Sequence, residues 1–258
     1  MCIIIAKPED VKLPSFKTIE TCWNNNPHGA GFCFPDKDSG KVVISKGYES
    51  LVPFYDDLKE AENMPLIIHF RIATSGFVNK EQTHPFPIIN SKDELDSIYT
   101  HTTWSFAHNG MLAMEDKKNN MSDSQVFVRD ILSHIIDPFK IEMHDSVGSI
   151  LDLIAKESRS KFALMNRQGK IFMYGGFEKV DSLFYSNDTY KEEKWDYTKY
   201  LKGWHADKED SLPIIPINKS EYSLEMICST CSRYYDEKSA DQNEYVCQYC
   251  GGWLDSFN

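Results

Sequence analysis

The 258-residue sequence contains no long apolar run and no cluster of basic residues. No stretch approaches the roughly 20 apolar residues that cross a bilayer, so no membrane-spanning helix is expected. Lys and Arg number 28 against 39 Asp and Glu, and the formal net charge of −11 is unfavourable for general nucleic-acid binding, which needs basic groups for phosphate contacts. The opening "MCIIIAKPED" lacks the basic segment and the apolar length of a secretory signal. A cytoplasmic protein is therefore expected.

The seven cysteines are an odd number, which argues against a closed disulfide framework. Four of them form two CxxC pairs with 15 residues between the pairs: Cys228, Cys231, Cys247 and Cys250. Two CxxC turns can bring four thiolates to the tetrahedral site that Zn²⁺ prefers. The pattern predicts a structural zinc ribbon over residues 225–258, joined by a polar, proline-containing linker over residues 201–224. Because all four ligand positions would be filled, the ribbon is expected to hold shape or contact a partner.

The first 200 residues read as a mixture of helices and strands. Apolar segments bounded by turn residues predict strands at "CIIIA", "GAGFCF", "KVVIS", "PLIIHF", "TWSFAH", "KFALMN", "KIFMYG" and "SLFYSN". Helices are predicted over residues 51–62 and 146–157 and from Ser122 onward, where Gln125 completes a capping-box signature. One apolar face of that last helix comprises Phe127, Ile131, Leu132 and Ile135. The order of elements predicts an α+β fold of packed sheets covered by helices.

Cys2 becomes the first residue if Met1 is removed, and it then carries its own base. A free α-amine has a pKa of about 8 and lies within reach of its own sulfur, so it can accept the thiol proton. The simpler alternative is a small apolar residue that opens a strand. Cys22 and Cys33 have no visible partner and are predicted to be buried thiols.

Other segments carry groups that would complement such a nucleophile, although each has an ordinary structural alternative. Arg71 follows an apolar strand and could bind a carboxylate, or form a surface ion pair. Asn109 and Gly110 could supply an oxyanion hole, or form a hairpin turn. Asp123 could bind an ammonium group, or simply favour a helix N-terminus. Together the groups describe a pocket for an amino acid with a side-chain amide, which is glutamine.

In their order along the chain, Cys2, "HGAGF", "HFRIATSG", "THPF", "FAHNGML" and "SDSQ" resemble the class II glutamine amidotransferases over about residues 2–190. The resemblance implies the four-layer αββα sandwich of N-terminal-nucleophile hydrolases over residues 2–200. It also implies that Cys2 is the nucleophile and that Asn109 and Gly110 stabilise the oxyanion. The residues implied to bind glutamine are Arg71, Thr74, His84 and Asp123.

Two positions depart from the family pattern, since Ile72 follows the arginine where Trp or Tyr is common, and Gln125 stands where an acidic residue is common. No segment resembles a synthase domain, so a separate chain is expected to use the released ammonia. Two further hypotheses remain. One is an N-terminal-nucleophile amidase that acts on another amide, and the other is an inactive adaptor whose zinc ribbon binds a partner.

Overall fold

The computed structural model describes residues 2–72, 78–191, 224–228, 234–236 and 254–256. The chain divides into two compact units, Met1–Glu192 and Glu193–Asn258. The predicted boundary at residue 200 lies outside the described residues and stays a prediction.

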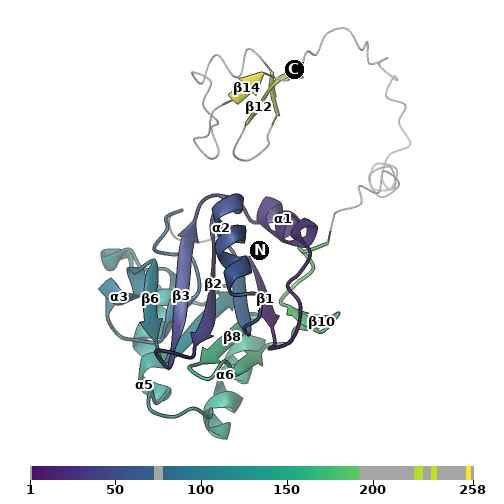
Figure 1. The fold of residues 1–258 in the computed structure, drawn as a ribbon. Helices are drawn as coiled ribbons and strands as arrows, with labels where there is room; N and C mark the ends of the chain where they lie inside the picture. Colours follow the sequence, from purple (N-terminus) through teal and green to yellow (C-terminus); the bar gives the residue numbers. More distant parts are fainter. Residues whose placement is uncertain (1, 73–77, 192–223, 229–233, 237–253, 257–258) are drawn as a thin grey trace, which may run out of the picture. The chain divides into compact units, whose positions relative to one another are not determined.

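The first unit contains two antiparallel sheets (Figure 1). The larger has the strand order β10-β11-β1-β4-β2-β3-β6 and the smaller β5-β7-β8-β9. The strands of the larger sheet are β1 (Ile3–Lys7), β2 (Ala30–Asp36), β3 (Lys41–Tyr48), β4 (Leu66–Phe70), β6 (Tyr99–Thr102), β10 (Glu178–Val180) and β11 (Leu183–Tyr185). Those of the smaller sheet are β5 (Phe86–Pro87), β7 (Trp104–Asn109), β8 (Lys161–Asn166) and β9 (Ile171–Tyr174).

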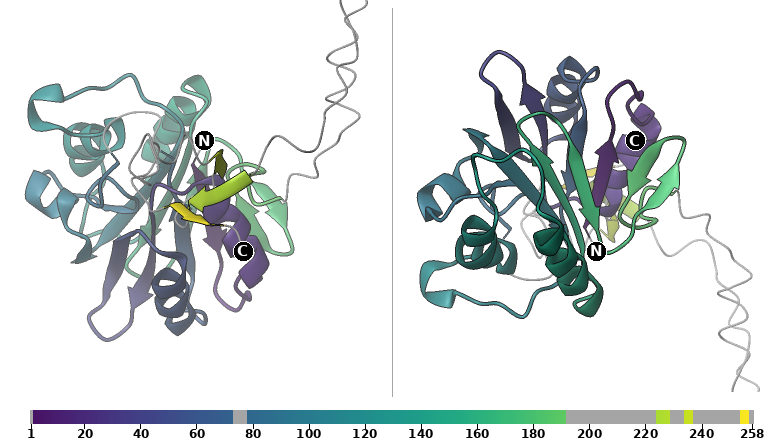
Figure 2. Two further views of the ribbon diagram at one scale, coloured as in Figure 1. Left: turned by 90° about the horizontal axis from the view of Figure 1, so that it is seen from above. Right: turned by 90° about the horizontal axis from the view of Figure 1, so that it is seen from below.

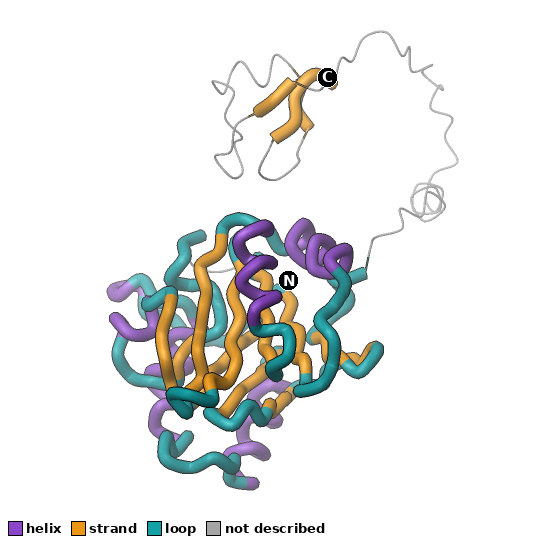
Figure 3. The backbone as a smooth tube through the Cα atoms, viewed as in Figure 1, coloured by secondary structure: helices purple, strands orange, loops and turns teal. Residues whose placement is uncertain are grey.

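The helices of the first unit lie outside the strands (Figure 3). They are α1 (Phe16–Asn25), α2 (Leu51–Glu60), α3 (Lys92–Asp96), α4 (Asp123–Phe127), α5 (Ser133–Ile135) and α6 (Asp145–Glu157), with a 3₁₀ turn η1 (Lys117–Asn119) and a π-helical turn η2 (Val128–Leu132). Seen from below, α1 and α2 lie on one side of the strands and α6 lies on the other (Figure 2, right).

Three buried apolar clusters account for this arrangement. The first joins α1 and α2 to the larger sheet and includes Trp23, Phe54 and Phe70. The second joins α4, η2 and α6 to the smaller sheet through residues such as Phe127 and Phe162. The third fills the space between the two sheets with small and branched side chains: Ile4, Cys33, Val42, Ile44, Ile67, Ala107, Ala163 and Met165. Burial of these apolar faces is the main force that holds the layers together.

All eight predicted strands are confirmed, as is the capping box at α4. Ser122 accepts a hydrogen bond from the backbone nitrogen of Gln125, whose side chain in turn accepts from the backbone of Ser122. Cys22 and Cys33 are fully buried thiols, as predicted. The helix after Ser122 is not regular, because η2 interrupts it.

The second unit contains a three-stranded antiparallel sheet with the order β13-β12-β14. Its strands are β12 (Leu224–Cys228), β13 (Tyr234–Asp236) and β14 (Leu254–Ser256). Throughout the described ranges, no helix has the length and apolar character that a bilayer crossing requires.

Candidate active site

Cys2 lies half-buried immediately before β1, opposite the end of β4. The two strands are antiparallel, and Ile3 pairs with Phe70. Cys2, just before Ile3, therefore lies near Ile72, which follows the end of β4. The thiol donates to the backbone oxygen of Ile72, and the backbone nitrogen of Ile72 donates to the sulfur, both at 3.4 Å. Burial raises the pKa of the Cys2 thiol above its ordinary value, although the Ile72 backbone and the Arg71 charge act in the opposite direction. The raised pKa favours the protonated thiol over the reactive thiolate.

Arg71 follows β4 directly and is buried, with 4% of its surface exposed. Its guanidinium donates to the backbone oxygen of Asn79 at 3.3 Å and to Oε1 of Gln82 at 3.2 Å. Both of these acceptors are neutral. Burial lowers the pKa of Arg71, whereas the charges of Cys2 and Asp123 raise it. The alternative of a surface ion pair at Arg71 is wrong, because the side chain lies inside the protein.

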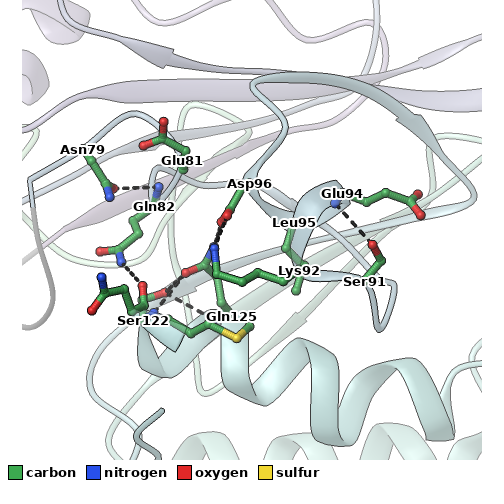
Figure 4. A network of polar contacts seen from close by, with 12 residues as sticks. Asn79, Glu81, Gln82, Ser91, Lys92, Glu94, Leu95, Asp96, Ser122 and Gln125 are labelled. Atoms are coloured by element: carbon green, nitrogen blue, oxygen red, sulfur yellow. Dashed lines mark hydrogen bonds and ion pairs between the residues drawn. The ribbon is translucent and has the colours of Figure 1, made fainter. Parts of the chain in front are cut away.

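Asn79 and Gln82, which accept hydrogen bonds from Arg71, belong to a larger polar network (Figure 4). Gln82 donates through Nε2 to the backbone oxygen of Asn120 at 2.9 Å, and its backbone nitrogen donates to Oδ1 of Asn79 at 3.1 Å. Nearby, Nε2 of Gln125 donates to Oδ1 of Asp96 at 2.7 Å. Gln125 therefore links α4 to α3. The glutamine that stands where an acidic residue is common in class II amidotransferases thus has a structural role in this chain.

Asn109 is the last residue of β7, and Gly110 follows it. The next strand along the chain begins at Lys161, so Asn109 and Gly110 do not form a hairpin turn. Asn109 is 3% exposed, and its Nδ2 donates to Oγ of Ser186 at 2.9 Å. Gly110 has φ +147°, and a Cβ there would lie 2.3 Å from Oγ of Ser160. Only glycine suits this position, because a side chain would displace the packed serine.

Asp123 is the first residue of α4, and its carboxylate organises the loop after Gly110. Oδ2 accepts from the backbone nitrogen of Leu112 at 2.8 Å, and Oδ1 accepts from the backbone nitrogen of Ser124, also at 2.8 Å. Oδ1 also accepts from the Ser124 hydroxyl at 3.3 Å, so the acceptor site left for a ligand ammonium is on Oδ2. Asp123 thus joins the helix N-terminus to the segment that carries the candidate oxyanion donors.

His84 belongs to a group of three buried histidines. Its ring centroid lies 4.4 Å from that of His69 and 6.3 Å from that of His108. His69 donates through Nε2 to the backbone oxygen of His108, and His108 is hydrogen-bonded to the hydroxyls of Ser124 and Ser160 at 2.8 and 3.0 Å. Burial lowers the pKa of His69 to about 3 and that of His108 to about 4, and holds that of His84 well below its ordinary value.

Neutral imidazoles therefore fill this space near Arg71. His108 connects this group to α4 through Ser124, and to the Gly110 segment through Ser160, which packs against Gly110. Gly31 marks a second close approach, because a Cβ there would lie 2.3 Å from the backbone oxygen of His84. His84 thus packs against β2, and its contact with glutamine stays a prediction.

The remaining predicted site residues are not described. Thr74 lies outside the described residues, as do Cys231, Cys247 and Cys250. Cys228 ends β12, where only the backbone is described, and it pairs in register with Leu254 at the start of β14. Among the described residues, no group of three or more His, Cys, Asp or Glu could hold a metal ion.

Two residues that the sequence did not single out hold the site together. Ser186 follows β11, and its hydroxyl accepts from the backbone nitrogen of Ile4 at 2.8 Å as well as from Asn109. Asn187 donates through Nδ2 to the backbone oxygen of Cys2 at 2.6 Å. The only sequence signal was a polar pair directly after a short apolar strand, which is common at strand ends.

Comparison with known proteins gives a limited result. No family model and no curated protein matches the chain, whereas 19 chains of solved structures do. One of these structures is glutamine phosphoribosylpyrophosphate (PRPP) amidotransferase from B. subtilis, complexed with ADP and GMP. The identity is 15% and the TM-score 0.37, over 72% of this chain and 41% of that chain. The chain thus spans less than half of that protein's length, and a likeness at this level assigns no function.

Proposed function

We propose that the chain is a glutamine-hydrolysing subunit of the class II glutamine amidotransferase type, with its first unit built as a four-layer αββα sandwich. One observation carries the proposal: a thiol, a buried guanidinium and a carboxamide lie at strand ends that hydrogen bonds link to one another. Cys2 precedes β1, Arg71 follows β4 and Asn109 ends β7. Hydrogen bonds through Ile72 and Ser186 connect these strand ends.

The proposed chemistry begins after removal of Met1. The freed α-amine of Cys2 accepts the thiol proton, and the sulfur attacks the side-chain amide carbon of glutamine to form a C–S bond. The raised pKa of the thiol supports the need for such a base. The protonated amine then donates its proton to the leaving nitrogen as the C–N bond breaks. Water opens the resulting thioester, which yields glutamate and restores the thiol.

Two charged groups suit the two ends of the amino acid. Arg71 would bind the α-carboxylate of glutamine, and Asp123 would bind its α-ammonium group. Arg71 is buried, and a buried guanidinium binds a carboxylate strongly because little water competes. Asn109 and Gly110 would donate to the oxyanion, which in comparable sites contributes about 3–4 kcal/mol per donor. Thr74 and His84 are proposed to shape the same pocket.

The second unit is proposed to be a structural zinc ribbon. Cys228 is the last residue of β12, and it pairs with Leu254, the first residue of β14. The sequence places Cys250 four positions before Leu254, so a tetrathiolate site at this end of the sheet is compatible with the register. Ammonia released by the first unit is proposed to be used by a separate synthase chain.

The test of the glutaminase proposal is ammonia release from glutamine, asparagine and propionamide by the natively processed protein. Glutamine should be strongly preferred, because asparagine is too short to place its amide at Cys2 while both charged ends are held. Propionamide has no charged ends for Arg71 and Asp123. Equal rates on all three would favour a general amidase, and no release from any of them would favour an inactive adaptor.

A further inference from the structure

The Ser186 hydroxyl joins the two sheets at the site. Its Oγ accepts from the backbone nitrogen of Ile4, in the larger sheet, at 2.8 Å. It also accepts from Nδ2 of Asn109, in the smaller sheet, at 2.9 Å. The backbone nitrogen of Ser186 donates to the Ile4 oxygen at 3.0 Å, which fixes the serine itself. Ser186 is therefore a buried link between the strand that carries Cys2 and the end of β7.

The neighbouring residue fixes the backbone of the nucleophile. Asn187 donates to the Cys2 oxygen at 2.6 Å, and its own Oδ1 accepts from the backbone nitrogen and the hydroxyl of Thr189 at 3.1 and 2.9 Å. Because Asn187 is anchored at both ends of its side chain, Cys2 cannot move independently of the segment after β11. The consecutive residues Ser186 and Asn187 thus set the position of Cys2 relative to Asn109.

The hydrogen-bonding capacity of Ser186 decides how the Asn109 amide is held. A hydroxyl has two acceptor sites, and the bonds from Ile4 and Asn109 occupy both. The amide nitrogen of Asn109 has two hydrogens, of which Ser186 receives one. Oδ1 of Asn109 is buried and has no hydrogen-bond partner among the described residues. The bond to Ser186 therefore determines which way the second N–H points.

We propose that Ser186 is a positioning residue for the reaction: it fixes the rotation of the Asn109 carboxamide so that the second N–H faces the oxyanion. This inference rests on the proposed function, in which Asn109 stabilises the tetrahedral intermediate. Ser186 acts through Asn109 and does not touch the substrate. Its loss should therefore affect kcat much more than the KM for glutamine.

The experiment measures kcat and KM for glutamine in Ser186→Ala, in Asn109→Ala and in the double variant. Removal of an oxyanion donor typically lowers kcat about 100- to 1000-fold, so loss of its orientation should lower kcat about 10- to 100-fold in Ser186→Ala. KM should stay within about two-fold. In the Asn109→Ala background, Ser186→Ala should lower kcat no further, because the residue through which it acts is already gone.

Matched variants separate positioning from stability. Ser105→Ala removes a fully buried hydroxyl of β7, one that contacts Cys33 at 3.1 Å and not the site, so it should keep the wild-type kcat. Ser186→Thr retains the hydroxyl and should recover most of the lost rate. If circular dichroism shows that Ser186→Ala does not fold, Ser186→Cys takes its place in the comparison with Asn109→Ala and the double variant. The cysteine keeps a weak acceptor of similar size.

Three results would overturn the inference, and they separate its failure from failure of the proposed function. Wild-type protein that releases no ammonia from glutamine overturns the proposed function, and this inference with it. Active wild-type protein with an undiminished kcat in Ser186→Ala overturns the inference alone. The same holds if the two substitutions lower kcat additively, since Ser186 would then act independently of Asn109.

Discussion

The sulfur of Cys2 and the backbone nitrogen of Ile72 lie 3.4 Å apart, and this contact joins the start of β1 to the end of β4. Class II glutamine amidotransferases commonly have an aromatic residue at the position of Ile72. The contact nevertheless uses only the backbone of Ile72. Any residue other than proline can therefore provide it. The contact holds the thiol beside Arg71, whose charge partly offsets the effect of burial on the thiol pKa.

Cys2→Ser should nearly abolish glutamine hydrolysis, because a hydroxyl is a much weaker nucleophile at neutral pH. A variant that retains Met1 ahead of an intact Cys2 should also be inactive, since the thiol is present but the free amine is not. Intact-mass measurement establishes the N-terminus of each protein, and an ammonia assay gives its rate. Cys22→Ala, which removes a buried thiol of the first core, is the control and should stay active. Wild-type rates with Met1 retained would contradict self-activation.

Arg71→Ala and Asp123→Asn should each raise the KM for glutamine. Each removes one charge-assisted contact, which is worth roughly 1.5–3 kcal/mol, or about a 10- to 150-fold change. Asp123→Asn keeps an oxygen acceptor for the Leu112 backbone nitrogen, so it separates charge from loop structure. Arg129→Ala is the matched control, because this arginine pairs with Asp116 and Asp130. It should lower stability at most and leave KM unchanged; an equal KM effect in all three variants would exclude specific glutamine contacts.

The apolar patterns along the chain were sufficient to predict most strands and the general α+β arrangement. They did not predict α1, although Ser15 caps it and Ile19, Cys22 and Trp23 form its buried face. Thr18 and Thr21 have low helix propensity and obscure that pattern. The periodicity after Ser122 placed Ile135 inside, but the π-helical turn changes the phase of the helix. Val128 and Leu132 are buried, and Ile135 is 36% exposed.

Residue type alone was enough to single out Cys2, Arg71 and Asn109 as candidates for the site. The supporting residues were not. Ser186 acquires its role only because β11 pairs with β1, a contact between the two ends of the first unit. Nothing in the local sequence indicates that two strands so far apart along the chain pair with each other. Serine is also an ordinary residue at the end of a strand.

Gly31→Ala should destabilise the first unit by more than about 2 kcal/mol, since the new methyl group would meet the His84 backbone oxygen at 2.3 Å. Gly40→Ala is the control: no atom lies within 4 Å of its added Cβ, and only its φ of +63° is unfavourable. It should cost about 1 kcal/mol. Urea unfolding of both variants makes the comparison. Similar losses would mean that the segment around His84 can move away from β2.

Stability should fall as the pH decreases from about 6.5 towards 4. The unfolded chain protonates histidine near its ordinary value of about 6.5, whereas burial lowers the folded-state pKa to about 3 for His69 and about 4 for His108. The unfolded state therefore binds more protons in this window, and the loss should reach a few kcal/mol, on the order of 2–4. Asp116, with a pKa lowered to about 2, contributes only at more acidic pH.

Urea unfolding between pH 4.5 and 7 measures this dependence. His69→Gln should reduce the slope, because one of the three buried histidines with a lowered pKa is gone. Repeating the series at low and high salt provides the control, since buried groups are screened far less than surface charges. A slope that disappears at high salt, or that is unchanged in His69→Gln, would assign the dependence to the protein surface.

The full-length protein should contain one Zn²⁺ per chain, bound by Cys228, Cys231, Cys247 and Cys250. Metal analysis and zinc titration against a competing chelator should show that Cys247→Ser binds zinc much more weakly, because a hydroxyl does not replace a thiolate ligand. Binding should also weaken as pH falls, since four thiols must lose their protons to form the site. Cys22→Ala, at a buried cysteine of the first unit, should retain the full zinc content. If Cys247→Ser keeps stoichiometric zinc at wild-type affinity, this cysteine is not a ligand and the ribbon assignment is wrong.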